Sequence, residues 1–309
     1  MKKYLFLLLL GFISFINAQE FPVLKGDYLG QTPPGNIPVI FARGIVSSDD
    51  KEHWAPRFSP DGNKVFWWSI RQVNDKWLDF HKTMRRVEGK WSAPEVSPFD
   101  NAPIFSPDGK RLYFGSKNEG EDLYYVEKEG NRWSKPKSLS LVTRFPEVRF
   151  AYFPTITRNG TLYFMGYLEG QRSNIAIYRS QIVNGEYVKP ELLPKNINTP
   201  GDSILNWTPY IAPDENYLIF CRRRITPKDD YGDLYICFRQ PDGSWADPVS
   251  LGEPINSKEL ERFPYVSPDG KYLFFTRDTN LPGYVYDEDV YWVSAKIIDR
   301  LREKYYLNK

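Results

Sequence analysis

Two carboxylates at matching positions of an internal repeat have the residue type that acid–base chemistry needs. Asp100 and Glu261 each stand three residues before a proline that opens a repeated motif, so the repeat predicts equivalent places for them. Two carboxylates at a suitable separation can split a glycosidic bond. Glycosidic cleavage by Asp100 and Glu261 is therefore one hypothesis for this chain.

A mixed set of aromatic, amide and charged residues occupies the two positions before the first strand of each repeat. Two residues before the proline stand Trp54, Asn101, Tyr152, Trp207 and Arg262, and three residues before it stand His53, Asp100, Ala151, Asn206 and Glu261. Such a ring could stack on a flat ligand and hydrogen-bond to it. The alternative is that the aromatic rings pack between neighbouring repeats and the charged groups face water.

Basic residues recur after the second strand of several repeats. Arg222 and Arg277 stand at similar points, as do Arg71 and Lys117, and together they predict a basic collar for a carboxylate, a phosphate or a uronic acid. The alternative is a solvated loop whose charge is neutralised by nearby aspartates.

Several kinds of chemistry are excluded or unsupported by the residues present. The chain has two histidines, His53 and His81, which rules out a His-rich metal site. No Gly-x-Ser-x-Gly elbow, phosphate loop or dinucleotide fingerprint occurs, so we predict no metal and no cofactor. The sequence leaves open whether Cys221 and Cys237 form a disulfide or remain two buried thiols.

The charge balance excludes one class of partner. Lys and Arg number 41 and Asp and Glu 39, and removal of Lys2 and Lys3 with a signal peptide would leave 39 of each. A balanced chain exerts no long-range attraction on nucleic acid, so we predict no nucleic-acid partner.

The elements that position these residues come from a motif repeated about every 50 residues, a period typical of repeat architectures. In its fullest form the motif has a proline, three residues and then Ser-Pro-Asp-Gly. The five copies are 56–62, 103–109, 154–160, 209–215 and 264–270. The third and fourth depart from it, with Arg158-Asn159-Gly160 and Pro213-Asp214-Glu215, and Glu215 predicts a turn that is either strained or of another type.

Each repeat predicts four strands. The motif supplies a first strand and a tight turn, an apolar run such as Val65 to Trp68 supplies a second, and an acid or amide opens a third. After a glycine turn, a fourth strand runs from an aromatic residue to a proline, as from Trp91 to Pro94. Because proline cannot donate to a strand ladder, the fourth strand is expected at the outer edge.

These repeats predict an all-β fold, a five-bladed β-propeller of four-stranded antiparallel blades. The repeats lie near 54–99, 101–140, 152–197, 207–256 and 262–295. The last repeat lacks its outer strand, while residues 35–46 belong to no repeat and resemble an outer strand. We therefore expect the N-terminal strand to complete the last blade and close the ring.

The Ser-Pro-Asp-Gly turn before an apolar strand resembles the WD40-like propeller repeat of TolB-type proteins, and the resemblance covers nearly the whole mature chain. TolB-like propellers usually carry six blades, so six is the alternative, with the sixth in residues 19–50. The resemblance implies a fold and is nearly silent on function. Five-bladed propellers also include glycoside hydrolases with carboxylates at their inner-strand ends, which supports the enzyme hypothesis by fold analogy alone.

Lys2 and Lys3, an apolar run from Tyr4 to Ile16 and a cleavage site after Ala18 predict a signal peptide over residues 1–18. Residues 19–309 are then one propeller domain, and no later stretch is apolar enough to span a bilayer. We expect an exported monomer, periplasmic or secreted.

The functional hypothesis rests on the loops of the predicted propeller. Longer connections, such as those from Arg71 to Trp77 and from Arg222 to Tyr231, are predicted on one face, and binding usually lies on such loops. We predict a non-catalytic binding propeller for a protein, peptide or glycan at this long-loop face. The alternative is the carbohydrate-active enzyme, a glycoside hydrolase or lyase with carboxylates at the channel mouth.

Overall fold

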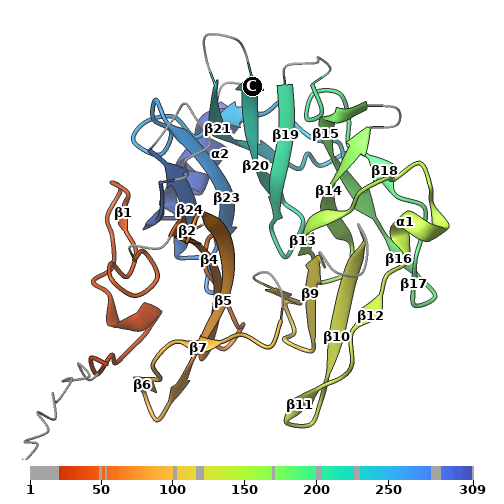
Figure 1. Cartoon of the computed structure of the whole chain (residues 1–309). Coiled ribbons are helices and arrows are strands. Elements are labelled where there is room, and N and C mark those ends of the chain that lie inside the picture. The colour runs from red at the N-terminus through yellow and green to blue at the C-terminus, as the bar shows by residue number, and fades with distance from the viewer. Residues whose placement is uncertain are drawn as a thin grey trace, which may run out of the picture.

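The computed structural model describes residues 21–48, 51–52, 54–99, 103–115, 122–168, 171–199, 204–225, 230–279 and 287–307. The predicted signal peptide and three predicted site residues, His53, Asp100 and Asn101, lie outside these ranges. The described chain is nearly all β and has a β-propeller fold, as the repeats predict (Figure 1).

The strands form five antiparallel units, one for each copy of the motif, and they follow one another around a common centre (Figure 1). The inner strands are β3 (Arg57–Phe58), β8 (Ile104–Phe105), β13 (Tyr152–Ile156), β19 (Ile204–Ile211) and β23 (Leu260–Val266). The second strands are β4 (Lys64–Val73), β9 (Arg111–Gly115), β14 (Leu162–Leu168), β20 (Tyr217–Ile225) and β24 (Tyr272–Asp278). The third strands are β5 (Lys76–Val87), β10 (Leu123–Glu129), β15 (Gln171–Ser180), β21 (Asp230–Phe238) and β25 (Glu288–Ser294).

The outer strands are short and interrupted where the sequence places proline. Pro94 separates two outer pieces of the first unit, because a residue without an N–H cannot continue the ladder. The outer pieces are β6 (Lys90–Trp91), β7 (Glu95–Val96), β11 (Arg132–Trp133), β12 (Lys137–Ser138), β16 (Ile182–Val183), β17 (Glu186–Tyr187), β18 (Glu191–Leu192) and β22 (Val249–Ser250). We number the units one to five in chain order; β2 (Lys51–Glu52) pairs with β4 in unit one, and a single parallel bridge from Gly232 to Leu260 links units four and five.

The N-terminal segment pairs with the last strand of unit five. Strand β1 (Val39–Ile40) pairs antiparallel with β25, with Val39 opposite Trp292. The Phe41 N–H donates to the Val290 carbonyl at 2.7 Å, and Ser294 N–H donates to the Gly35 carbonyl at 2.9 Å. Earlier residues around the short 3-10 helix η1 (Tyr28–Gly30) lie against unit one, so one segment contacts both units.

The short turns of units one, two and five share one hydrogen-bond pattern between a serine, an aspartate and the backbone. In unit two, Ser106 Oγ donates to Asp108 Oδ1 at 2.6 Å, and Asp108 Oδ1 accepts from Lys110 N–H at 3.0 Å. Gly109 takes the left-handed φ of 70° that ends the turn. Glu215 adopts φ 60° at the equivalent place in unit four, so of the two alternatives that its missing glycine left open, the strained turn is present.

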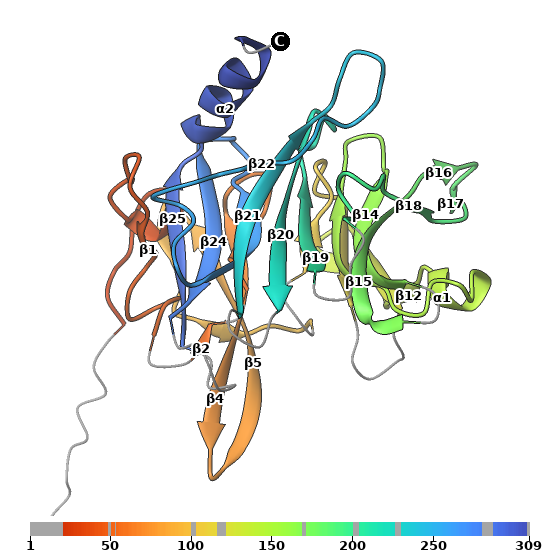
Figure 2. The same cartoon turned by 90° about the horizontal axis from the view of Figure 1, so that it is seen from above.

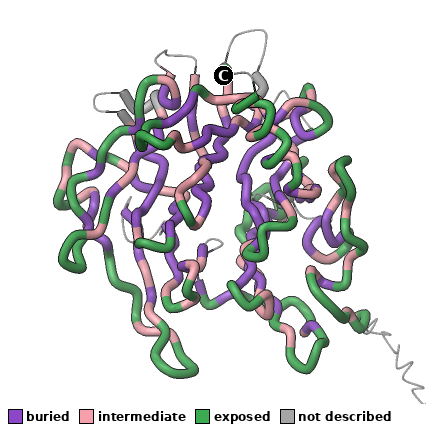
Figure 3. The backbone as a smooth tube through the Cα atoms, turned by 180° about the vertical axis from the view of Figure 1, so that it is seen from behind, coloured by how far each residue is buried: buried purple, intermediate pink, exposed green. Residues whose placement is uncertain are grey.

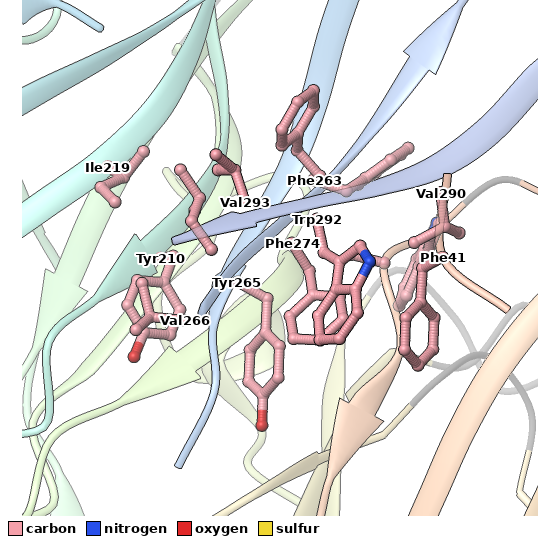
Figure 4. Packing of buried hydrophobic residues seen from close by; sticks show 14 of the residues in the cluster. Phe41, Tyr210, Ile219, Phe263, Tyr265, Val266, Phe274, Val290, Trp292 and Val293 are labelled. Atoms are coloured by element: carbon pink, nitrogen blue, oxygen red, sulfur yellow. The ribbon is translucent and has the colours of Figure 1, made fainter. Parts of the chain in front are cut away.

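The buried residues lie along the second strands and between neighbouring units (Figure 3). Trp67, Tyr163 and Phe274 are fully buried, as the apolar runs predict for strands that are covered on both faces. In the largest cluster, Phe41 meets Phe274 and Trp292 edge-on, each at 5.1 Å between ring centroids (Figure 4). This contact ties the N-terminal segment to the core of unit five.

Three elements differ from the sequence interpretation. In the predicted long connection from Arg222 to Tyr231, the described residues extend β20 and β21 as paired strands, with Arg224 opposite Tyr231. Residues 71–77, predicted as an irregular loop, extend β4 and β5 into a long hairpin whose two-residue turn, Asn74-Asp75, has φ values of 48° and 59° (Figure 2). Helix α2 (Lys296–Leu307) was not predicted, although its Ile298 packs against the core. The other helix is α1 (Leu141–Arg144), and no described helix is long and apolar enough to cross a membrane.

Candidate binding channel

Three of the inner strands carry the same β-bulge, each at the residue before the motif's proline. Phe153, Thr208 and Phe263 have φ values of 52°, 48° and 55°, and the strand register shifts beside each of them. A left-handed φ is rare for bulky or β-branched residues and costs on the order of 1 kcal/mol each. Bulges re-aim side chains and are frequent beside functional sites.

The bulges bring together an aromatic plug, formed by Trp54, Phe153 and Phe263 from units one, three and five. Trp54 lies 4.7 Å from Phe153 and 5.7 Å from Phe263 between ring centroids, and Phe153 lies 5.1 Å from Phe263. Because these residues lie at the start of their inner strands, the plug occupies the long-loop end of the space between the units. Only about 10 Å³ remains open in the pocket that the plug lines.

A larger space, the central cavity, lies among the short turns at the opposite end of the inner strands. Its volume is about 200 Å³, and all five units contribute to it. Its lining residues are Phe58, Pro60, Ile104, Phe105, Ser106, Pro107, Thr155, Ile156, Arg158, Tyr210, Ile211, Pro213, Tyr265, Val266 and Pro268. The lining is largely aromatic and apolar with a few polar groups, which is the usual character of a small-molecule site.

A side groove continues the central cavity outward between units two and three. Its volume is about 460 Å³, and it shares Ser106, Pro107, Ile156 and Arg158 with the cavity. Its further lining is mostly charged and of both signs, with Arg111 and Glu127 paired at 2.8 Å. The cavity and the groove together form one continuous polar-to-apolar path.

Arg57 lines the narrow pocket at the plug, which shares Ile104 with the central cavity. Its guanidinium sits over the ring of Tyr265, 4.7 Å from the centroid, and Tyr265 lines the cavity. Within the described part of the chain, Arg57 has no hydrogen-bond or ion-pair partner for its side chain, and its buried Nη1 is unpaired. Burial lowers the pKa of Arg57 from 12.5 to about 10, against the opposing effect of the Tyr265 and Tyr210 hydroxyls.

The aromatic residues predicted to form a ligand ring are largely packed. Trp54 is 3% exposed, and Trp207 and Tyr152 are half-buried. The Tyr152 ring occupies the space where a Cβ of Gly115 would lie, at 2.4 Å. Trp54 and Tyr152 meet edge-on at 5.9 Å, whereas the arginines Arg223 and Arg262 cover Trp207. These aromatic side chains therefore pack between neighbouring units, which is the alternative that the sequence left open for them.

Arg222 and Arg277, two members of the predicted basic collar, are tied to backbone carbonyls. Arg222 Nε donates to Asn206 Oδ1 at 3.0 Å, and its Nη2 donates to the Ile197 carbonyl at 3.0 Å. Arg277 does the same in unit five, with Glu261 at 2.7 Å and the Ile255 carbonyl at 2.8 Å. Both arginines clamp the connection from the preceding unit, which leaves fewer donors for a ligand.

Glu261, a carboxylate of the enzyme hypothesis, is fully buried and already satisfied. It accepts from Arg277 and from the Ser257 hydroxyl at 2.6 Å and the Ser257 N–H at 3.1 Å. Its neighbour Arg262 forms a buried ion pair with Glu288. Asp100, the other carboxylate of the pair, lies outside the described residues.

The residues that sequence reasoning passed over stand inside the motif itself. Arg57 directly follows the motif's proline, and Arg158 replaces the proline of the short turn. Arg158 stood out in the sequence as a departure of the short turn but not as a site residue, and aligning the five copies one residue after the first proline would have shown Arg57 as a second departure. The interpretation instead followed the residues before the proline, which the bulges turn into the plug.

The remaining reactive groups belong to the core. Cys221 and Cys237 are buried free thiols on neighbouring strands but not opposite each other, and burial raises the pKa of Cys221 to about 12. No group of three or more His, Cys, Asp or Glu side chains that could hold a metal ion occurs within the ranges given for the structure.

Comparison with known proteins identifies a shared fold. No protein-family model and no curated protein matches the sequence, so the TolB-type resemblance stays a prediction. The catalytic domain of the GH62 α-L-arabinofuranosidase from Coprinopsis cinerea is similar in structure at 10% identity, covering 84% of this chain and 97% of that one, with a TM-score of 0.50. A glycoside hydrolase is similar at 10% identity, covering 88% and 92%, also with a TM-score of 0.50. At an identity this low, the structural similarity shows a shared β-propeller fold and nothing about function, which has to be argued from the site itself.

Proposed function

We propose that the five units are the blades of one five-bladed propeller, closed by the pairing of β1 with β25. Contacts between neighbouring inner strands support this. The Thr208 hydroxyl accepts from Phe263 N–H at 3.3 Å between units four and five, and the Tyr265 hydroxyl donates to the Phe58 carbonyl at 3.1 Å between units five and one. The central cavity, to which every unit contributes, then lies on the propeller axis.

We propose that this propeller binds a carbohydrate in the central cavity. The observation that carries the proposal is the character of the lining, in which Phe58, Tyr210 and Tyr265 offer aromatic surface beside a few polar groups. None of the lining residues carries a carboxylate, an imidazole or a thiol, whereas cleavage of a glycosidic bond generally needs two carboxylates. The fold shared with glycoside hydrolases makes a carbohydrate the ligand class with the best support.

The proposed site lies at the short-turn face, whereas the sequence interpretation placed the ligand at the long-loop face. The physical reason is the aromatic plug, which fills the axis on the long-loop side. A cavity of about 200 Å³ is below the roughly 300–1,000 Å³ of sites for drug-sized ligands, so it suits one sugar ring rather than several. The side groove would hold the rest of an oligosaccharide.

A glycan array followed by titration calorimetry tests the proposal. The variant Pro213→Trp places a large ring at the cavity mouth, and Val96→Trp adds the same ring to the exposed edge strand β7 as a matched control. We expect the purified protein to bind at least one glycan class, Pro213→Trp to lose that binding, and Val96→Trp to keep it. Binding that survives in Pro213→Trp, with an unchanged melting temperature, would place the site elsewhere.

The second candidate is the carbohydrate-active enzyme, which the shared fold with glycoside hydrolases favours. It would use Asp100 and Glu261 at the long-loop end. Product formation from polysaccharides, measured by reducing-sugar release, tests it, with Asp100→Asn and Glu261→Gln as variants. Turnover that both variants abolish, with folding retained, would support the enzyme; no turnover on substrates that the protein binds would support the binding function.

The place of action follows from the N-terminus. We propose export through the predicted signal peptide of residues 1–18, and a monomer in solution. Mass spectrometry of the mature protein, which should begin at Gln19, and light scattering check these two statements.

A further inference from the structure

Two arginines break the symmetry of the repeat near the central cavity: Arg158 lines the cavity, and Arg57 lines the narrow pocket at the plug, which shares Ile104 with the cavity. One residue after the motif's first proline, the five blades carry Arg57, Ile104, Thr155, Tyr210 and Tyr265. At the second position of the short turn they carry Pro60, Pro107, Arg158, Pro213 and Pro268, all of which line the cavity. Position along the inner strand therefore places one arginine at the deep end and one at the mouth.

Neither of these two arginines has an acidic partner among the residues that the structure describes. Arg57 makes no hydrogen bond with its side chain, and Arg158, which is exposed, forms no ion pair. Three other arginines that the structure describes as buried or half-buried have such a partner: Arg222 pairs with Asn206, Arg262 with Glu288, and Arg277 with Glu261. Half-buried Arg239, like Arg57, lies over an aromatic ring, that of Trp245 at 4.8 Å, but it does not line the cavity.

An unpaired guanidinium in an apolar setting is costly, because removal from water is not compensated by an ion pair or hydrogen bonds. Among the residues that the structure describes, the compensation for Arg57 is its cation–π contact with Tyr265. A planar anion would satisfy it, since a carboxylate accepts two parallel N–H bonds from one guanidinium. The cavity is therefore poised for a ligand that supplies negative charge.

We propose that the central cavity binds an anionic sugar, a uronic acid at the end of an oligosaccharide, with its carboxylate on Arg57 and with Arg158 at the mouth. This inference rests on the proposed function and names its ligand class. The aromatic plug closes the axis behind Arg57, so a chain cannot thread through and only a terminal residue can enter. The side groove, lined by charges of both signs, receives the neighbouring sugars.

Calorimetric titration with matched sugars tests the ligand class. The probes are glucuronic and galacturonic acid, their neutral twins glucose and galactose, and oligogalacturonides of two to four residues. The variants are Arg57→Gln and Arg158→Ala, and the control is Arg85→Ala, which removes an equal charge from the exposed outer face of unit one. Thermal melting checks that each variant folds.

We expect the uronic acids to bind more tightly than their neutral twins, and Arg57→Gln to reduce their affinity about 10- to 100-fold, the usual worth of a charge-assisted hydrogen bond. Arg57→Gln should leave neutral-sugar binding unchanged, Arg158→Ala should have a smaller effect, and Arg85→Ala should have none. Equal binding of acidic and neutral sugars, unaffected by Arg57→Gln, overturns this inference and leaves carbohydrate binding standing. Binding of no sugar at all overturns both.

Discussion

Replacing Arg57 by methionine should stabilise the protein while removing its anion site. Methionine keeps an unbranched side chain of similar length and needs no partner, so the burial cost of the charge disappears. The lowering of the Arg57 pKa from 12.5 to about 10 corresponds to about 3 kcal/mol. Loss of the cation–π contact with Tyr265 gives back about 1–2 kcal/mol. The expected net gain in unfolding free energy is about 1–2 kcal/mol.

The pH dependence of this gain follows from the sign of the shift. The lowered pKa means that the unfolded chain holds the Arg57 proton more tightly than the folded protein does, so the penalty is present in full below about pH 10 and fades only above it. The advantage of Arg57→Met should therefore be constant between pH 5 and pH 9. Chemical denaturation at three pH values in this window measures it, and the melting temperature should rise by about 2–6 °C.

The same substitution at Arg222 is the matched control. Arg222 also lies over an aromatic ring, that of Tyr235 at 4.9 Å, but it donates to Asn206 and to two backbone carbonyls. Arg222→Met should therefore destabilise the protein by about 2–4 kcal/mol, because those acceptors lose their donor. If Arg57→Met also destabilises it by more than about 1 kcal/mol, Arg57 has a structural partner and the reasoning about an unpaired charge is wrong.

Three further predictions concern the fold. Phe41→Ala should lower the free energy of unfolding by about 3–5 kcal/mol in denaturant titrations, because a fully buried ring that joins β1 to unit five is lost. Asn256→Ala should cost about 1–3 kcal/mol in the same assay, since the Leu234 N–H loses its acceptor at 2.9 Å, while the Leu234 carbonyl loses the Asn256 donor at 3.0 Å and keeps the Leu251 N–H. Burial raises the pKa of Asp108, but hydrogen bonds from Ser106 and Lys110 outweigh this effect and hold the pKa below 3.8. The resulting contribution to stability is present above pH 4 and is lost as the pH falls through the lowered pKa. Ser106→Ala should therefore raise the pKa of Asp108 in an NMR titration.

The fold could be predicted because the same strand and turn pattern occurs five times in the sequence. The proline, the short turn and the apolar run place the inner and second strands without reference to anything distant in the sequence, and the segment from Gly35 to Phe41 follows from the missing outer strand of the last repeat. Helix α2 was missed because it follows the repeats, where the period gives no information. Its signal was present in the spacing of Ile297, Ile298 and Leu301 along one helical face.

The site could not be predicted from the same period because bulges redirect the side chains that the repeat aligns. A regular strand would leave the residue before the proline in an extended conformation, but Phe153, Thr208 and Phe263 take a left-handed φ and close the axis behind them. The aligned residues two positions before the proline thereby become packing, as Trp54 shows at 3% exposure. Nothing in residue type predicts this choice, because phenylalanine and threonine disfavour a positive φ.

The departures from the repeat carry more information about function than the repeat does. A residue that recurs from blade to blade serves the turns and packing that the blades have in common, as the serine and aspartate in the short turns of blades one, two and five do. A residue that differs in a single blade is better explained by a ligand on the propeller axis, because an asymmetric ligand there contacts each blade differently. Arg57 and Arg158 are such changes, and each puts a positive charge where the other four blades place an uncharged side chain. Neither charge is needed for the stability of the propeller, since an uncharged residue at the position of Arg57 and a proline at that of Arg158 fit the same backbone without the free-energy cost of burying or holding a charge.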